Sequence, residues 1–379
     1  MQHNVVIVGY ARSPFHFAGK GELTRVRPDE LAARVVRGLL DKTGVDPADI
    51  EDLIVGCAFP EGEQGLNVAR LIGFLADLPL DVAGATVNRF CGSSMQAIHM
   101  AAGAIQMDAG QAFVCAGVES MSRVPLAGFN PMLNPSLAER FPAAYVSMGE
   151  TAENVAAKFK IPRERQEKLA VESHRRAAAA RQDGKLKDEI IPIRQGNHTI
   201  DADGCIRPDT NAEALAGLKP AFKADGSVTA ATSSPLTDGA SAVLVTTEDY
   251  AEANGLAPLA RIRAIAVAGC APDIMGIGPV AASRKALTRA GLDVGDIDVI
   301  ELNEAFAAQA LACIDELGLD PARINIDGGA IALGHPLGAT GARITGKAAQ
   351  IMKREGGQLA LATQCIGGGQ GIATVLEAA

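Results

Sequence analysis

The chain has 379 residues, enough for two or three domains, and 48% of them are hydrophobic, whereas only 4% are aromatic. Its formal net charge of -9 argues against a nucleic-acid-binding protein, which presents a basic face. Seven cysteines form no C-x-x-C pair and no metal-like cluster, so we expect reduced thiols and no metal site. No apolar run is long enough to span a membrane, and the N-terminus lacks signal-peptide features, so we expect a cytoplasmic protein.

Residues 1–118 alternate between strand-like and helix-like segments. Apolar runs predict strands at 4–9, 52–56, 82–87 and 111–117. Apolar residues at helical spacing predict helices at 28–40 and 65–75, and a third that contains Met95, Ile98 and Ile105. This alternation predicts an α/β layered domain.

Residues 119–228 have a different composition, which predicts an insertion built from loops and amphipathic helices. Pro and Asn cluster at 125–135, a charged, alanine-rich helix is predicted at 163–181, and an irregular loop follows at 196–208. We expect residues 229–257 to return the chain to the first layered unit. Residues 258–379 show the α/β alternation again and predict a second unit.

The second unit repeats the first at a constant distance along the chain. The segment that begins at Gly44 resembles the one that begins at Gly291, and a Gly-Gln pair precedes a predicted strand at both Gly110 and Gly357. Both pairs of segments lie 247 residues apart. The chain is therefore predicted to use one α/β unit twice, with equivalent helix N-termini near a pseudo-twofold axis.

Cys91 is predicted to lie between the end of a strand and the start of a helix. Unpaired backbone N–H groups and the helix dipole favour a thiolate at such a position, so we expect a nucleophilic sulfur with a lowered pKa. The alternative is a small buried thiol without a catalytic role, which is common for free cysteines. The segment around Cys91 does not decide between the two.

Three further segments of the second unit carry unusual chemistry: Asn303-Glu-Ala-Phe, the glycine-rich run 328–341 that contains His335, and Gln364-Cys365-Ile-Gly-Gly-Gly. We expect each at the carboxyl end of a strand, where open α/β sheets place their sites, with glycine N–H groups directed at an anion. Taken singly, each residue has a structural explanation. Together they supply a nucleophile, a base, a second thiol and an amide donor, as acyl transfer with carbon–carbon chemistry requires.

These four motifs, in this order, resemble the signatures of the thiolase family, and the resemblance covers essentially the whole chain. It implies a duplicated five-layer α-β-α-β-α fold with an inserted loop domain that binds coenzyme A. It also implies that His335 takes the proton of Cys91, which then carries the acyl group. Cys365 would protonate the departing acetyl-CoA enolate or deprotonate acetyl-CoA in reverse.

The resemblance implies two oxyanion sites. One consists of His335 and a water held by Asn303, and the other of the backbone N–H groups of Cys91 and Gly367. Coenzyme A would be a substrate, and no permanently bound cofactor is expected. The positions that match coenzyme A contacts of the family are Arg207, Met148, Phe222, Ser234 and Phe306. The chain departs from many relatives at Ser147 and Ala214, which bear on the pantetheine and phosphate contacts.

Several motifs, among them the segment 56–70, are more similar to degradative 3-ketoacyl-CoA thiolases of fatty-acid β-oxidation. The glycines after Cys365 favour the alternative, a biosynthetic acetoacetyl-CoA thiolase. A condensing enzyme would carry a second His near Asn303 or Cys365, and a thiolase-like lipid carrier would lack one of the reactive residues. The family also implies a homodimer or homotetramer, with the strand after the Cys91 helix at the interface. In some bacteria a hydratase–dehydrogenase subunit is a further partner.

Overall fold

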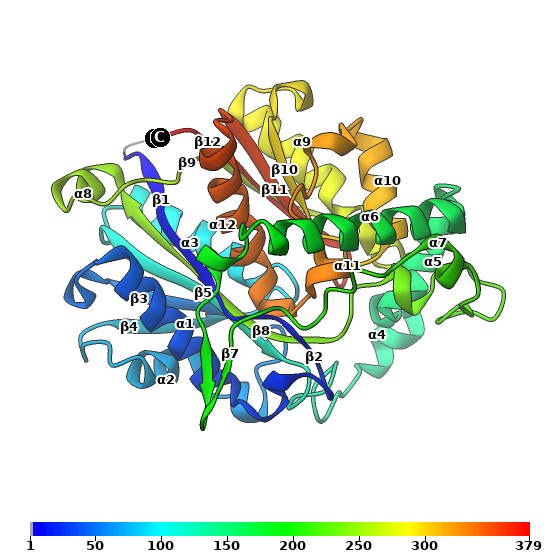
Figure 1. The fold of residues 1–379 in the computed structure, drawn as a ribbon, viewed down its shortest axis with the longest axis horizontal. Coiled ribbons are helices and arrows are strands. Elements are labelled where there is room, and N and C mark those ends of the chain that lie inside the picture. The colour runs from blue at the N-terminus through cyan, green and yellow to red at the C-terminus, as the bar shows by residue number, and fades with distance from the viewer. Residues whose placement is uncertain (1–2) are drawn as a thin grey trace.

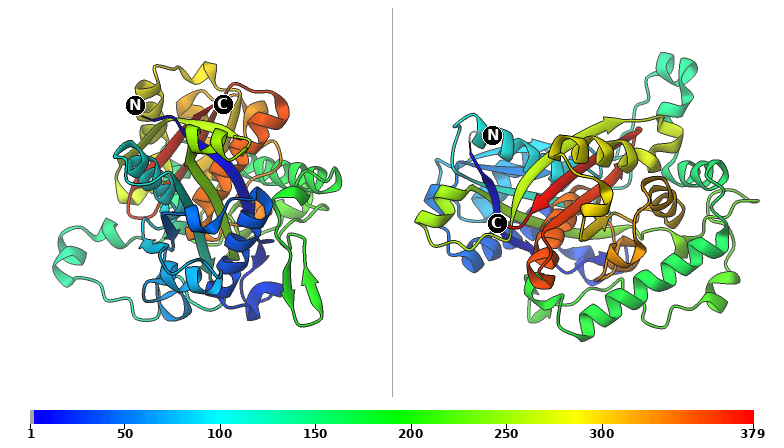
Figure 2. Two further views of the ribbon diagram at one scale, coloured as in Figure 1. Left: turned by 90° about the vertical axis from the view of Figure 1, so that its left-hand side faces the viewer. Right: turned by 90° about the horizontal axis from the view of Figure 1, so that it is seen from above.

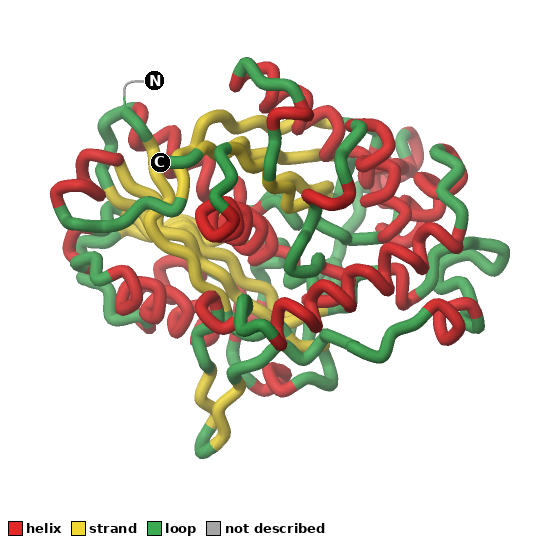
Figure 3. Tube along the Cα trace, turned by 45° about the horizontal axis from the view of Figure 1, so that its top comes forward, coloured by secondary structure: helices red, strands yellow, loops and turns green. Residues whose placement is uncertain are grey.

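Two groups of strands form the centre of the protein in the computed structural model, which describes residues 3–379 (Figures 1 and 3). The first group comprises β1 (Val5–Arg12), β2 (His16–Phe17), β3 (Asp52–Gly56), β4 (Ala83–Val87), β5 (Ala112–Ser120) and β8 (Thr237–Thr247). The second comprises β9 (Ala260–Gly269), β10 (Val299–Leu302), β11 (Leu359–Ile366) and β12 (Gln370–Glu377).

The strand order is the same in both groups, except that the second group has no full strand at the place of β4. It runs β4-β3-β5-β8-β1 in the first and β10-β11-β12-β9 in the second. In each group the strand that follows the inner helix pairs parallel to one neighbour and antiparallel to the other. Within residues 3–379, two residue pairs, Val6 with Arg261 and Ile7 with Ala260, join β1 to β9 and make the two groups one continuous sheet.

Helices cover both outer faces and fill the space between the two groups of strands. The outer helices are α1 (Pro28–Thr43) and α2 (Val68–Leu75) on the first group, and α9 (Gly278–Ala290) and α10 (Ala307–Leu317) on the second. The inner helices are α3 (Ser93–Gln106) and α12 (Leu337–Glu355). Side chains alternate across each strand, so Val114 of β5 faces the outer helices and Cys115 faces the inner ones. The predicted five-layer α-β-α-β-α fold is confirmed.

The internal repeat is also confirmed at the level of single elements. The starts of β3 and β10, and the starts of β5 and β11, each lie 247 residues apart. The same separation relates Asn88 to His335 and Cys91 to Gly338. The counterpart of β4 in the second half is reduced to a single bridge between Ile300 and Ile324.

Residues 119–228 form α4 (Pro135–Arg140), α5 (Met148–Lys158), α6 (Arg163–Gln182), α7 (Ala212–Ala216) and a hairpin of β6 (Ile193–Gln195) and β7 (His198–Ile200). Helix α6 crosses the face of the second half in Figure 1, and α4 lies on an arm that stands away from the body in Figure 2. The remaining helices are α8 (Glu248–Ala253), before β9, and the short α11 (Ala330–Leu333).

Buried ion pairs attach this insertion to the layered core. Arg12 of β1 contacts Glu189 at 2.8 Å and Asp203 at 2.6 Å, and all three side chains are almost fully buried. Lys347 of α12 contacts Glu189 at 2.8 Å and Asp327 at 2.7 Å. Buried charges are stable only when they are paired, so these contacts fix residues 189–203 against β1 and α12.

Two expectations from the sequence are wrong. Strand β5, which follows the Cys91 helix, is buried between β3 and β8 and has no free edge for a subunit interface. The free edge of the first half belongs to β4 instead. The glycine-rich run 328–341 does not follow a strand, because the preceding segment forms only the bridge at Ile324. Among the described residues, no helix is long and apolar enough to cross a membrane.

Candidate active site

Cys91 lies in a turn that side-chain hydrogen bonds hold in place. The Asn88 side chain accepts from the Phe90 N–H at 2.9 Å, and the Ser93 hydroxyl accepts from the Arg89 N–H at 2.8 Å. Phe90 has a φ of 43°, an unfavourable value for a residue with a large side chain. The side-chain amide of Gln364 donates to the Cys91 carbonyl and so links the turn to β11. The turn is therefore fixed before any substrate binds.

Two backbone N–H groups face the Cys91 sulfur, those of Gly367 and of Cys91 itself. Both favour the thiolate, but burial outweighs them and raises the pKa of Cys91 to about 11. The expectation of a lowered pKa is therefore wrong for the free protein. Helix α3 starts only at Ser93, so the helix terminus does not compensate for the loss of solvent around the sulfur.

Gly367 belongs to the three-residue turn between β11 and β12. Ile366 pairs with Gln370, which leaves residues 367–369 as the loop. Gly368 and Gly369 have φ values of 77° and 83°, which glycine adopts without strain. The run of glycines thus lets β11 turn sharply and brings the Gly367 N–H to the Cys91 sulfur.

His335 is 4% exposed and makes three hydrogen bonds. Its backbone N–H donates to the Thr237 hydroxyl at 3.0 Å, and its ring contacts the Thr340 hydroxyl through Nδ1 at 2.6 Å. Thr340 donates its own proton to the Pro336 carbonyl at 3.0 Å, so its oxygen accepts from Nδ1–H. The other ring nitrogen, Nε2, lies 3.4 Å from the Asn303 amide nitrogen, a donor. These contacts assign the proton to Nδ1 and leave Nε2 able to accept one.

Burial and the charge of Arg343 lower the pKa of His335 to about 3. The imidazole is therefore neutral at physiological pH. Because the pKa of Cys91 is raised, the two groups form a neutral thiol and a neutral imidazole, not an ion pair. Proton transfer from Cys91 is then expected to accompany attack on a substrate. Among the described residues, the hydrogen bonds of His335 go to Thr237, Thr340 and Asn303.

Asn303 follows β10 and is fully buried. Its N–H donates to the Thr363 carbonyl at 3.0 Å, which extends the β10–β11 pairing by one residue. Its side-chain oxygen has no hydrogen-bond partner among the described residues, although buried polar atoms usually have one. This amide therefore has an unused acceptor next to His335.

Cys365 lies within β11 and is fully buried in an apolar cluster with Met275, Ala305 and Phe306. Burial, and next the proximity of Cys91, raise the pKa of Cys365 well above the usual value of a thiol. Cys365 is consequently protonated at neutral pH, the form that donates a proton. Cys91, Cys365 and the Gly367 N–H thus lie together, and His335 lies beside Asn303, which directly follows the strand paired with β11.

Two buried carboxylates, which the sequence analysis did not assign, support this region. Glu119 at the end of β5 accepts from the N–H groups of Ala58 at 2.8 Å and Gly338 at 2.9 Å. Glu304, next to Asn303, accepts from Ser173 of α6 at 2.7 Å and from the Ile331 N–H at 3.2 Å. Each joins segments far apart in the chain, so spacing along the sequence carries no signal for them.

Glycines of the run 328–341 serve packing within the protein. A Cβ at Gly338 would lie 2.6 Å from the Val118 carbonyl, and one at Gly329 would lie 2.0 Å from the Glu304 carboxyl group. The Gly338 N–H is already bound by Glu119. The Gly329 N–H donates to the Ser173 hydroxyl at 3.2 Å. For these two glycines, the expectation that their N–H groups face an anionic ligand is wrong, because both N–H groups donate to side chains of the protein.

Four of the five residues predicted to contact coenzyme A lie together. The Phe222 and Phe306 rings meet edge to face with centroids 5.9 Å apart, and the Ser234 N–H donates to the Ala305 carbonyl at 2.9 Å. A Cβ at Gly367 would lie 3.5 Å from the Met148 sulfur, which connects this group to the Cys91 region. The fifth residue, Arg207, lies over the Phe17 ring at 5.0 Å, and no described contact joins it to the other four.

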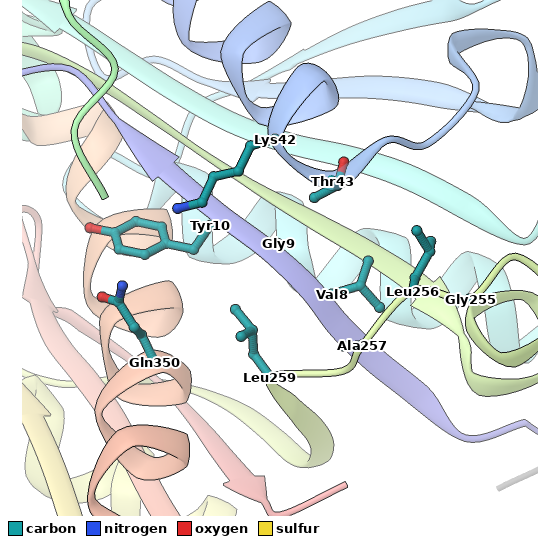
Figure 4. Close-up of a pocket in the computed structure, with 10 residues that line it drawn as sticks. All are labelled: Val8, Gly9, Tyr10, Lys42, Thr43, Gly255, Leu256, Ala257, Leu259 and Gln350. Carbon is teal, nitrogen blue, oxygen red and sulfur yellow. The ribbon is translucent and has the colours of Figure 1, made fainter. Parts of the chain in front are cut away.

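A cavity of about 270 Å³ lies elsewhere, where β1 and β9 diverge (Figure 4). Its lining includes Tyr10, Lys42, Leu259 and Gln350, and none of the predicted site residues. The Lys42 ammonium group donates a hydrogen bond to the Asp188 carbonyl. This cavity is therefore separate from the candidate active site.

The fold consists of two copies of one α/β unit in five layers. The candidate site lies between the two copies, and both contribute residues to it. The chain matches the model of the thiolase N-terminal domain over residues 5–249 and that of the thiolase C-terminal domain over residues 256–378. It belongs to the thiolase family.

Individual relatives match over nearly the full length. The chain is 48% identical to a 3-ketoacyl-CoA thiolase of Bacillus subtilis (strain 168), with 98% of each chain covered. It superposes on human mitochondrial 3-ketoacyl-CoA thiolase in complex with CoA with a TM-score of 0.93 and 38% identity, covering 100% of this chain and 98% of that one. It superposes on Bacillus anthracis acetyl-CoA acetyltransferase with a TM-score of 0.92 and 40% identity, covering 100% of this chain and 99% of that one.

Proposed function

We propose that the protein is a degradative 3-ketoacyl-CoA thiolase, which cleaves a 3-ketoacyl-CoA with coenzyme A into acetyl-CoA and a shortened acyl-CoA. The observation that carries the proposal is the approach of two thiols beside the Gly367 N–H: the partly buried Cys91 from one half and the buried Cys365 from the other. Thiolytic carbon–carbon cleavage needs one thiol to carry the acyl group and an acid for the carbanion. The full-length similarity to enzymes named for this reaction supports it.

The first half-reaction assigns a role to each reactive group. Cys91 gives its proton to Nε2 of His335, and the sulfur attacks the keto carbon. The N–H groups of Cys91 and Gly367 stabilise the oxyanion that forms. The bond between C2 and C3 then breaks, and the acyl group stays on Cys91. His335 and a water held by Asn303 stabilise the acetyl-CoA enolate until Cys365 protonates it.

The second half-reaction restores every group. A fresh coenzyme A gives its thiol proton to the Cys365 thiolate and attacks the acyl-Cys91 thioester. Cys91 leaves as a thiolate and regains its proton from the imidazolium of His335. Coenzyme A is thus a substrate, and the steps use no permanently bound cofactor. We propose that the insertion 119–228 and the return segment 229–257 hold coenzyme A through Met148, Phe222 and Ser234, together with Phe306 of the second half. Arg207 lies near the adenine and phosphate end in this proposal.

The central test is thiolysis of acetoacetyl-CoA and longer 3-ketoacyl-CoAs, followed by absorbance. Cleavage of neither would refute the thiolase proposal, and cleavage of only the four-carbon substrate would favour the biosynthetic alternative. Cys91→Ala is expected to abolish the acyl-enzyme in mass spectra. Cys365→Ala is expected to retain acylation by a simple acyl-CoA while carbon–carbon cleavage stops. Full thiolysis by Cys365→Ala would contradict the assignment of two separate thiol roles.

We further propose a homodimer in which two copies pair through the free edge of β4. Four of the five β4 residues are only partly buried, and Leu80, just before the strand, is 76% exposed. An unpaired strand edge with apolar neighbours is a typical pairing surface. Ala85→Lys is expected to shift the sedimentation coefficient to that of a monomer. An unchanged coefficient would contradict the use of this edge.

We propose that two such dimers associate into a homotetramer through the arm that carries α4. Its exposed apolar side chains include Phe129, Met132 and Leu133, between 56% and 84% exposed. If the arm binds a hydratase–dehydrogenase subunit instead, the purified protein will sediment as a dimer.

A cytoplasmic location would keep the seven free cysteines reduced.

A further inference from the structure

The neighbours of Gly367 bear on where the chain of an acyl-Cys91 would lie. An acyl-Cys91 whose thioester oxygen accepts from the N–H groups of Cys91 and Gly367 lies next to Gly367, so the first atoms of its chain lie near this glycine. Two side chains flank this glycine. A Cβ at Gly367 would lie 3.5 Å from the Met148 sulfur and 3.7 Å from the Phe90 ring. Met148 belongs to the group proposed for coenzyme A, which leaves the Phe90 side for the acyl chain.

A second aromatic ring continues the surface beyond Phe90. The centroid of the Phe59 ring lies 6.0 Å from that of Phe90, with the two planes inclined by 46°. Phe90 is 38% exposed, and Phe59 is partly buried. The two rings form an apolar surface that starts at the reactive cysteine and leads away from it.

Both rings are attached to fixed backbone. The Phe59 N–H donates to Glu119 at 3.3 Å, and its carbonyl accepts from the Gln64 side chain at 2.9 Å. The Phe90 backbone is held by Asn88 and Ser93. The positive φ of Phe90 is thereby maintained and directs its ring toward Gly367. A rigid apolar surface binds an alkyl chain without an entropic cost of ordering the protein.

We propose that Phe59 and Phe90 form the acyl-chain wall of the site and give the enzyme its preference for 3-ketoacyl-CoAs longer than four carbons. The proposal rests on the thiolase function above and specifies its substrate class. A four-carbon substrate places an acetyl group on Cys91, which ends beside Gly367. A longer chain passes Phe90 and contacts Phe59. Each methylene that the wall removes from water should raise kcat/KM about fourfold.

The test compares kcat/KM for four-, eight- and twelve-carbon 3-ketoacyl-CoAs in the wild-type enzyme and in Phe59→Ala. The variant is expected to lose on the order of tenfold for the longer substrates, the equivalent of two methylenes, and less than threefold for acetoacetyl-CoA. Phe59→Leu, which keeps an apolar side chain, should lie between the two. Phe74→Ala is the matched control, because Phe74 is 45% exposed on the outer helix α2.

A second measurement is independent of the amount of folded variant. Butyryl-CoA and dodecanoyl-CoA compete for Cys91, and mass spectrometry gives the ratio of the two acyl-enzymes. A ratio shifted toward butyryl in Phe59→Ala supports the wall. An equal loss for all chain lengths, an unchanged ratio, or a gain for long chains would overturn it. These outcomes presuppose that the wild-type enzyme cleaves 3-ketoacyl-CoAs, whereas a wild-type protein that cleaves none refutes the proposed function itself.

Discussion

Thr340→Val is expected to weaken His335 as the base for Cys91 without changing the shape of the site. The Thr340 hydroxyl is fully buried and accepts from Nδ1–H of His335 at 2.6 Å. Valine fills the same volume but leaves this N–H unpaired, at a cost of about 1–3 kcal/mol. The imidazole can avoid that cost only by moving its proton to Nε2, where it faces the Asn303 amide and can no longer accept the proton of Cys91.

Either response should lower kcat/KM for thiolysis, by about five- to 150-fold if the cost is expressed fully in the transition state. The assay is the loss of acetoacetyl-CoA absorbance in the presence of coenzyme A. Thr340→Ser restores the hydroxyl and is expected to stay within about threefold of the wild type. If Thr340→Val cleaves acetoacetyl-CoA as fast as Thr340→Ser, the hydroxyl does not set the proton position on His335, and the reasoning fails.

Three further predictions concern the thiol, the buried charges and the close packing. Since burial raises the pKa of Cys91 to about 11, its alkylation by iodoacetamide should accelerate about tenfold per pH unit from pH 7 to 10; a plateau near pH 8 would contradict this. Arg12→Met leaves the buried Asp203 carboxylate without its ion pair, and Glu189 with Lys347 alone, and should lower the free energy of unfolding by about 3–5 kcal/mol, whereas Arg165→Met, in an exposed pair, should cost less than about 1 kcal/mol. Gly338→Ala should lower the melting temperature, because its methyl group would lie 2.6 Å from a carbonyl oxygen; an unchanged value would contradict the packing argument.

The fold could be predicted because its signals are local and repeated. Apolar runs at 52–56 and 299–302 correspond to β3 and β10 without a shift. The 247-residue separation, inferred from Gly44 and Gly110, extends to Asn88 and His335, which occupy equivalent turns. Cys91 is the fourth residue of the turn that begins at Asn88, and His335 is the first residue of the equivalent turn in the second half. A duplicated pattern of strands and turns survives even where the chemistry of the two copies has diverged.

The electrostatics of the site could not be predicted, because they depend on contacts between distant segments. A cysteine before a helix suggests a lowered pKa, but what decides the outcome for Cys91 is the loss of solvent around its sulfur, which outweighs the two backbone N–H groups that favour the thiolate. The role of Thr340 is likewise visible only once the His335 ring is placed. Glu119 binds Gly338 across 219 residues of sequence, and no spacing rule connects them. The motifs therefore located the reactive atoms, and packing decided their protonation.

The weak joint between β1 and β9 bears on how the enzyme keeps its alignment. Two residue pairs join β1 to β9, and α12 of the second half adds further contacts by packing against β5, β8 and β1 of the first half. A further contact between the halves is the crossing of α3 and α12. They meet at equivalent residues: the Ala342 N–H donates to Ser94 at 2.8 Å, and a Cβ at Gly341 would lie 2.3 Å from the Met95 nitrogen. If heating loosens this packing before either half unfolds, the residues that the two halves contribute to the site lose their alignment. Turnover should therefore decline at temperatures below the unfolding transition.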